Sequence, residues 1–350
     1  ENTAQMYKTN IIVKNGNINF NKYQKSNLYI IFIRLFGNIV SKRGVIMLNQ
    51  PFLFDHTMRE LFEYPDPSVP FIVWTGDFRT FIDHTIDCHW HNEFEYGVLL
   101  SGELDYYIDG QHIRIRQGDV VFINANTMHM ATPVSDLDNV VMFTVSFLPS
   151  LFTGGNEGTM FRKYFQPVLQ SSVMGFSIEH TTYEGKNIVK LLNEIYDLDD
   201  KRTDNYELLC ISLISRIWSF TLCYIKEHKH EFIPFRTDHR NEKKAKDIMA
   251  YIHKHYAENI RIEDIARNTG ISRSECFRSF QRYTNKNPVG YLTEYRLAHA
   301  ANLLKETDKS VTQIAMECGF SNSSYFGKIF KKKYAITPSR FKNSLPTVGI

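Results

Sequence analysis

The chain has 350 residues and a mass of 41.0 kDa, and its 43% hydrophobic and 23% charged residues are typical of a globular protein with two or three domains. Residues 241–350 contain 19 Lys and Arg against 10 Asp and Glu (+9), whereas residues 47–240 contain 15 against 27 (−12). A basic last third predicts contact with a polyanion, and a solvated lysine-rich surface is the alternative. The five cysteines are odd in number and lack CxxC spacing, which argues against a disulfide framework.

Residues 1–46 differ in composition from the rest of the chain. Their apolar run LYIIFIRLFGNIV is interrupted by Arg34 and is too short to span a bilayer. No small-residue cleavage site follows it, which argues against a signal peptide. We expect the native chain to start at Met47 and residues 1–46 to be a non-native or disordered leader.

Short apolar runs follow one another between Phe71 and Phe147. The runs ELDYYI, HIRIR, VVFIN and VVMFTVSF are typical of strands, and Asp109-Gly110 and Gln117-Gly118 are turn signals between them. Many short strands with closely spaced turns indicate a β-sandwich or a barrel. We expect a small β-barrel in the first domain, which we place at residues 47–175.

Two histidines and a carboxylate lie at the start of this region. His89 and His91 are two residues apart, so a strand would place them on one face, and Glu95 follows at the same parity. His129 ends the segment GDVVFINANTMH. The two segments resemble the paired motifs of the cupin fold. Three positions depart from that pattern: Asp83 replaces the leading glycine of the first motif, and Asn124 and Asn126 replace the proline and glycine of the second.

This cluster admits two chemical interpretations. His89, His91, Glu95 and His129 could hold a divalent metal such as Zn, Fe or Mn. The same side chains could instead line a polar pocket that hydrogen-bonds a sugar or another polyol without a metal. Trp74 and Tyr106 are candidates for stacking on such a ligand, although aromatic residues inside a barrel are commonly core.

The apolar periodicity changes to about 3.6 residues between Tyr183 and Glu231, which predicts helices. We expect one apolar face made of Ile188, Leu191, Leu192 and Ile195. We expect a second made of Leu208, Ile211, Ile214 and Trp218. These faces could pair with a second copy of the chain or pack inside one subunit. We assign residues 176–235 to a helical dimerisation and coupling region, and the basic stretch RTDHRNEKKAK to a hydrophilic linker.

The last third of the chain contains an internal repeat. RIEDIARNTGISRSECFRSF aligns with VTQIAMECGFSNSSYFGKIF, so that Gly270 matches Gly319 and Phe280 matches Phe330. Each copy has an apolar-faced helix, a turn with glycine and a second helix, which is the helix-turn-helix pattern. Ser272 and Glu275 predict a capping box at the start of the second helix of the first copy.

The two copies resemble the DNA-binding domain of the AraC/XylS family of bacterial transcription regulators. The run IAMECGFSNSSYFGKIFKKKYAITPSRF matches the family signature closely, and the resemblance covers about residues 246–343. We assign residues 236–345 to this double helix-turn-helix domain. The predicted fold class is therefore multidomain α+β: a cupin or jelly-roll-like barrel, then helices, then an all-α C-terminal domain.

The resemblance also implies which side chains contact DNA. A connecting helix of about 18 residues would be about 27 Å long, which suits two recognition helices in successive major grooves about 34 Å apart. The expected base contacts come from Ser274 and Arg278 in the first helix and from Ser324 and Lys328 in the second, and Arg278 suits a bidentate guanine contact. Further expected DNA contacts are Arg273, Asn322, Ser323, Lys331 and Lys332, the two lysines on phosphates.

The same resemblance implies a ligand-responsive transcription regulator, an activator or a repressor, in the bacterial cytoplasm and associated with the nucleoid when bound to DNA. We expect it to be a homodimer with promoter DNA, a small polar effector such as a sugar, and RNA polymerase as partners, without membrane association and without enzymatic activity. The alternative is a metal-dependent cupin-type enzyme, an oxygenase or isomerase, fused to a DNA-binding module.

Overall fold

The computed structural model describes residues 12–14, 17–19, 54–55, 57–81, 84–134, 139–155, 158–228 and 239–343. Strands β1 (Ile12–Lys14) and β2 (Asn17–Asn19) form an antiparallel pair that belongs to a separate compact unit. The other residues of 1–46 lie outside the described ranges. The prediction that this segment is a non-native or disordered leader therefore concerns residues that the structure does not describe.

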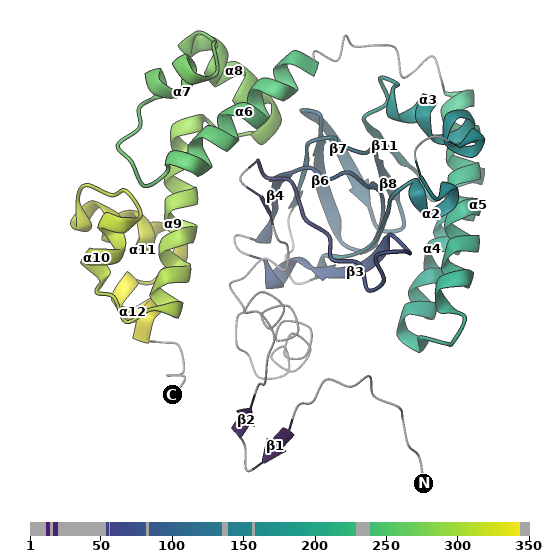
Figure 1. Cartoon of the computed structure of the whole chain (residues 1–350), viewed down its shortest axis with the longest axis horizontal. Coiled ribbons are helices and arrows are strands. Elements are labelled where there is room, and N and C mark those ends of the chain that lie inside the picture. Colours follow the sequence, from purple (N-terminus) through teal and green to yellow (C-terminus); the bar gives the residue numbers. More distant parts are fainter. Residues whose placement is uncertain are drawn as a thin grey trace. The chain divides into compact units, whose positions relative to one another are not determined.

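Among the described residues from Phe54 onward, nine strands form two antiparallel sheets (Figure 1), which confirms the α+β fold class. The expected closed barrel is wrong, because the two sheets are separate layers. The five-stranded sheet has the order β11-β8-β5-β10-β3 and the four-stranded sheet the order β4-β9-β6-β7. Their bounds are β3 Phe71–Asp77, β4 Ile86–His89, β5 Phe94–Ser101, β6 Glu103–Ile108, β7 Gln111–Arg116, β8 Val120–Ile123, β9 His129–Pro133, β10 Val141–Phe147 and β11 Gly175–Ile178.

The predicted turns between strands form where left-handed backbone is required. Asp109 and Gly110, with φ of 50° and 75°, connect β6 to β7, and Gly118, with φ of 87°, precedes β8. Glycine takes such angles without steric cost. The Asp109-Gly110 turn fixes the register in which β6 pairs with β7.

Two long helices cover one face of the five-stranded sheet. Helices α4 (Tyr183–Lys201) and α5 (Tyr206–Glu227) lie side by side (Figure 1) and share a core with the aromatic residues of β5, β8 and β10. The predicted face of α4 is confirmed, because Ile188, Leu191, Leu192 and Ile195 are all buried.

The predicted face of α5 is wrong in part. Ile214 and Trp218 are buried in the subunit's own core, whereas Leu208 is 69% exposed. Leu208 and Ile214 are six residues apart. At about 100° per residue, their side chains point about 120° apart around the helix axis, so they do not share a face. Packing within one subunit accounts for the buried residues of this helix, which are Tyr206, Cys210, Leu213, Ile214, Ile217, Trp218 and Thr221. Among the described residues it is the one helix whose length and composition would also suit a membrane span, which by itself is weak evidence for one, and a third of that span is buried in this structure.

Short helical segments complete this part of the chain. They are η2 Phe78–Thr80, α2 Ser150–Thr153, the π-helical turn η5 Phe161–Phe165 and α3 Gln166–Leu169. Helix α3 and the residues after it are held to the sheet because the Asn124 side chain donates hydrogen bonds to the carbonyls of Val168 (2.9 Å) and Val173 (2.7 Å). Asn124, one of the positions that departs from the cupin pattern, therefore has a structural role here.

The C-terminal part is all helical. Its helices are α6 His239–His255, α7 Ile262–Asn268, α8 Arg273–Thr284, α9 Pro288–Glu306, α10 Val311–Glu317, α11 Ser323–Tyr334 and α12 Pro338–Asn343. Helices α7 and α8 form the first helix-turn-helix unit, and α10 and α11 form the second (Figure 1). Gly270 and Gly319 have φ of 66° and 80° in the two turns, and Phe280, Phe326 and Phe330 are fully buried.

The basic stretch predicted as a linker is helical from His239 onward. Ala245, Ile248, Met249 and Ile252 are buried at helical spacing, so α6 packs into the first helix-turn-helix unit. Glu242 and Lys246, one turn apart, form an ion pair at 2.8 Å. The sequence prediction missed this helix because the many charged residues at its start drew attention away from the apolar positions that follow at helical spacing. Residues 236–238 lie outside the described ranges.

Candidate functional site

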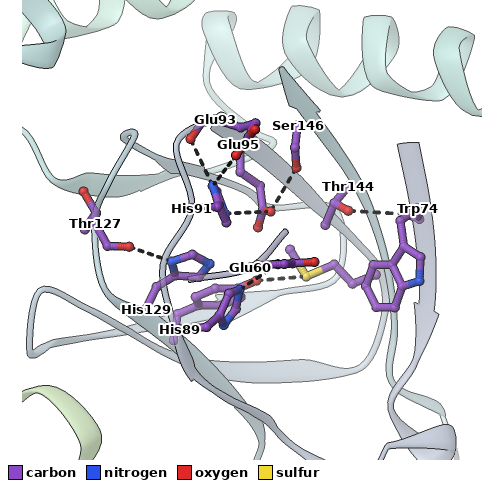
Figure 2. Close-up of polar contacts among 12 residues, drawn as sticks. Glu60, Trp74, His89, His91, Glu93, Glu95, Thr127, His129, Thr144 and Ser146 are labelled. Atoms are coloured by element: carbon purple, nitrogen blue, oxygen red, sulfur yellow. Dashed lines mark hydrogen bonds and ion pairs between the residues drawn. The ribbon is translucent and has the colours of Figure 1, made fainter. Parts of the chain in front are cut away.

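Three histidine rings meet in the space between the two sheets (Figure 2). His89, at the end of β4, pairs in register with His129, at the start of β9, so both rings lie on the same face of the four-stranded sheet. His91 follows two residues after His89. The ring centroids are 4.1 Å apart for His89 and His129, 4.9 Å for His91 and His129, and 5.9 Å for His89 and His91. All three rings are at least 95% buried.

Each ring is oriented by a backbone carbonyl two residues away. The Nδ1 atoms of His89, His91 and His129 lie 2.8, 3.1 and 2.9 Å from the carbonyl oxygens of Asp87, Glu93 and Thr127. A carbonyl accepts only, so each Nδ1 carries a proton and donates it. The Nε2 atoms are thereby left to face one another.

Buried carboxylates surround the rings. Glu95, on β5 of the opposite sheet, approaches His91 Nε2 at 3.4 Å and accepts a hydrogen bond from Ser146 at 3.1 Å. Glu60 approaches His89 Nε2 at 3.3 Å (Figure 2). Glu93 accepts a hydrogen bond from Tyr64. All four predicted cluster residues therefore converge, and two further carboxylates join them.

Sequence reasoning missed Glu60 and Glu93. Glu93 has a local signal, because it follows His89 and His91 at the same parity. Glu60 has none, because it comes from a segment before the first strand. That segment reaches the site because Glu60 N donates to the Trp90 carbonyl and Trp90 N donates to the Met58 carbonyl. Only the tertiary structure brings it there.

The charges in the cluster alter its pKa values in different directions. Burial disfavours the charged form of His91, but the adjacent Glu95, with Glu60 and Glu93 beyond it, raises its pKa to about 9. Burial likewise opposes ionisation of Glu95, and His91 nevertheless holds its pKa below the usual value. Burial and the two neighbouring imidazoles lower the pKa of His129, which stays neutral.

The two predicted stacking residues lie on the same interior but not on the histidines. Trp74 on β3 is opposite Thr144 on β10, and this pair shares the sheet face of Ser146 and therefore of Glu95. Tyr106, on β6, is 2% exposed, and its hydroxyl contacts Met142 Sδ at 3.2 Å. Trp74 is thus placed to border a ligand, whereas Tyr106 forms part of the packed wall.

A second candidate site is the exposed surface of the two recognition helices. In α8, Arg273, Ser274 and Arg278 are exposed, and Arg273 forms an ion pair with Glu263 at 3.2 Å. Ser274 and Arg278 are four residues apart and therefore share one face. In the second unit Ser324, Lys328, Lys331 and Lys332 are exposed and Ser323 is half-buried. The residues predicted to contact DNA are thus accessible in both units.

Two side chains at the helix starts have structural roles. Asn322 is the N-cap of α11, and its Oδ1 accepts hydrogen bonds from the backbone amides of Ser324 (2.8 Å) and Tyr325 (3.0 Å). Ser272 caps α8 by accepting from Glu275 N, but the Glu275 carboxylate pairs with Lys244 of α6. The capping box predicted there is therefore half formed, because an ionic partner from another helix takes the carboxylate.

Comparisons with known proteins agree with this arrangement. Residues 72–197 match the model of the AraC-like ligand binding domain, and residues 265–344 match the model of a helix-turn-helix domain. The chain belongs to the AraC family of transcriptional regulators. The strands that hold the histidine cluster lie in the region matched to its ligand-binding domain, and the recognition helices lie in the region matched to its DNA-binding domain.

Relatives of this AraC-family regulator match 71–83% of the chain. The chain is 28% identical over 293 residues to an uncharacterised HTH-type transcriptional regulator, YdeC, of Bacillus subtilis, covering 83% of this chain and 98% of the relative. It is 24% identical to the HTH-type transcriptional activator RhaS of Salmonella arizonae, covering 71% and 85%. A solved AraC-type regulator structure from Chromobacterium violaceum matches 31% of this chain and 96% of its own, at 30% identity and a TM-score of 0.29.

We expect the Asn322→Ala variant to be less stable by about 1 kcal/mol, within a range of roughly 0.5–2, because it loses both cap hydrogen bonds. Asn322→Asp should retain most of that stability, since aspartate also accepts from the N-terminal amides. Urea unfolding followed by circular dichroism measures the difference, with the exposed neighbour Ser321→Ala as control. Equal stability of Asn322→Ala and the wild-type chain would show that the cap contributes nothing.

Proposed function

We propose that this regulator binds promoter DNA through α8 and α11 and controls that binding, or its consequences, through a small polar effector held at the histidine cluster. The observation behind the proposal is the convergence of His89, His91, His129 and Glu95 in a buried interior. Buried polar atoms there, such as His129 Nε2, have no hydrogen-bond partner among the described residues. Buried polar groups are costly unless a partner satisfies them, and a polyol such as a sugar supplies both donors and acceptors. The domain binds a signal and does not catalyse a reaction.

DNA recognition is divided between the two units in the proposal. Arg278, exposed in α8, suits the bidentate contact with guanine, and Ser274 lies beside it on the same face. Lys328 and Ser324 occupy the matching face of α11, while Lys331 and Lys332 neutralise phosphates. Helix α9, with 19 residues, is about 28 Å long and connects the two units at a separation suited to adjacent turns of one groove.

A path between the two sites runs through strand β4. His89 enters the cluster, whereas the preceding residue, Cys88, donates a hydrogen bond to the carbonyl of Tyr283 in α8 at 3.2 Å. Asp87 forms an ion pair with Lys286 at 3.2 Å, immediately after α8. A shift of β4 on effector binding would therefore alter contacts with the first helix-turn-helix unit. Such coupling needs a different effector affinity in the two arrangements, by about 1–3 kcal/mol.

A second path uses the loop before His129. Lys246 of α6 donates a hydrogen bond to the carbonyl of Asn126 at 2.8 Å, and its ammonium lies 4.1 Å from the centroid of the Trp90 ring. The Asn126 amide in turn donates to the His91 carbonyl. Residues next to two of the three cluster histidines thus contact the helix that packs into the DNA-binding domain.

The proposal also includes a homodimer that works with RNA polymerase in the cytoplasm and associates with the nucleoid when bound. The exposed apolar side chains of the long helices, Tyr183, Tyr196 and Leu208, supply a surface for a second copy. An isologous pair of such surfaces would present two DNA-binding domains to repeated half-sites.

We expect Arg278→Ala to weaken binding to the cognate operator by about 1–3 kcal/mol and to change binding to random DNA little, because it removes a base contact. Lys331→Ala should weaken both and reduce the salt slope by about 1. Fluorescence anisotropy at several salt concentrations gives both numbers. An equal loss on both DNAs for Arg278→Ala would remove it from base recognition.

We expect sedimentation at micromolar concentration to show a dimer and Leu208→Glu to shift it toward monomer, because a buried charge without a partner is costly. Leu208→Ala should weaken the dimer less than Leu208→Glu. A wild-type monomer with and without effector would contradict the dimer.

We expect one or more compounds in a panel of sugars and polyols to raise the melting temperature of the full chain, because a ligand stabilises the state it binds. His91→Ala should lose that response, whereas His112→Ala, a substitution of an exposed histidine on β7, should retain it. Circular dichroism checks that both variants fold. A response that persists in a folded His91→Ala protein would place the effector elsewhere.

A further inference from the structure

We propose that Lys244 of α6 is a positioning residue for DNA recognition: it holds the carboxylate of Glu275 and thereby leaves the guanidinium of Arg278 available to a base. The inference rests on the proposed guanine contact of Arg278 and adds to it a residue outside the recognition helix. Three features of the C-terminal domain support it: a carboxylate on the recognition helix, an arginine three residues after it, and a lysine from another helix that takes the carboxylate.

Glu275 places a negative charge on the part of α8 that is proposed to approach DNA. It lies in the first turn of the helix, next to Ser274, and its side chain is 36% exposed. DNA carries a phosphate charge about every 1.7 Å of its axis, so a carboxylate here opposes binding unless a cation offsets it. Residue Glu275 therefore needs a partner within the protein.

Arg278 is the partner that local helix geometry would supply. Residues three apart are neighbours on a helix surface, and opposite charges at this spacing attract. The Lys244 ammonium, with Arg278 as a further contribution, lowers the pKa of the Glu275 carboxyl. The guanidinium of Arg278 nevertheless makes no hydrogen bond or ion pair with the described residues. If it did pair with Glu275, that pair would have to break before a bidentate contact with guanine could form.

Lys244 provides the alternative partner. Its ammonium donates a hydrogen bond to the Glu275 carboxylate, and it also lies 3.3 Å from Asn241 Oδ1. The Lys244 side chain is only 17% exposed, and the next residue, Ala245, is fully buried where α6 packs into the first helix-turn-helix unit. A lysine held in this way loses less conformational freedom on pairing than a fully exposed lysine does. The pair is therefore well placed to compete with Arg278 for the carboxylate.

The arrangement belongs to the first unit. Glu275 lies five residues before Phe280, and the matching position in the second copy, five residues before Phe330, is Tyr325. Tyr325 carries no carboxylate, so the lysine three residues after it, Lys328, has no such competitor. The residue that must be kept from Arg278 and the lysine that keeps it thus occur together in the unit whose recognition helix carries the arginines.

The test is fluorescence anisotropy of the full-length chain on two duplexes: one enriched from a random-sequence library by the wild-type chain, and a shuffled version of it. We expect Lys244→Met to bind the enriched duplex about 2–5-fold more weakly, because Glu275 then pairs with Arg278. The double variant Lys244→Met/Glu275→Gln should regain wild-type affinity, and Lys244→Arg, which can still hold the carboxylate, should lose nothing. Lys243→Met, which removes the same charge from an exposed neighbour, should have little effect.

The Arg278→Ala background decides whether Lys244 acts through the arginine. There, Lys244→Met should cost nothing further on the enriched duplex. An equal cost with and without Arg278 would overturn the inference, because Lys244 would then act on DNA by itself. A folded Lys244→Met chain that binds like the wild type, or one that Glu275→Gln does not restore, would also overturn it.

Circular dichroism checks that each variant folds, and Lys244→Gln replaces Lys244→Met in the same comparisons if that variant does not. The two proposals fail in different ways. An Arg278→Ala chain that binds both duplexes as tightly as the wild type would refute the proposed base contact, and the role of Lys244 with it. A loss of affinity for Arg278→Ala without any loss for Lys244→Met would refute the role of Lys244 alone.

Discussion

Six ionisable side chains are buried together between two sheets, and the surrounding backbone is arranged to make that possible. In each of the three histidines the orienting carbonyl lies two residues away, at Asp87, Glu93 and Thr127. The turns beside β4, β5 and β9 therefore decide the tautomer of the rings. Because a buried lone pair without a partner is costly, the cluster is most stable when something occupies it. A domain with this property responds to occupancy, as a sensor must.

Because side chains alternate along a strand, the strands that hold the cluster also contact helices through their other face. On β5, Glu95 faces the cluster, while the next residue, Tyr96, faces the helices and its hydroxyl lies 2.6 Å from Thr221 Oγ1 in α5. On β4, His89 faces the cluster and Cys88 contacts Tyr283 of α8. Each strand thus joins the cluster to a different helical layer, one with the exposed surface proposed for dimerisation and one with a recognition helix. A single change in the cluster can reach both.

The sequence predicted what depends on local pattern. Apolar runs located β6, β7, β8 and β10, and periodicity located the apolar face of α4. The repeat located both helix-turn-helix units, and parity along the strand placed His89 and His91 on one face. It failed where a partner comes from far along the chain: Glu60 meets His89 through tertiary pairing, and the Glu275 carboxylate binds Lys244 in place of its own helix start. It also failed where one helix is apolar on most sides, because composition alone cannot orient α5, and Leu208 was grouped with the buried Ile214.

The two recognition helices differ in the chemistry that they offer to DNA. Helix α8 exposes Arg273 and Arg278, whose guanidinium groups can make bidentate contacts, and Arg273 is already paired with Glu263. Helix α11 begins with a capping asparagine and serines and ends with three lysines, which suit phosphates better than bases. Sequence discrimination should therefore concentrate in the first unit, while the second supplies affinity and register. Strand β4 contacts the first unit through Tyr283 and Lys286, so the histidine cluster is connected to the unit in which we expect specificity to concentrate.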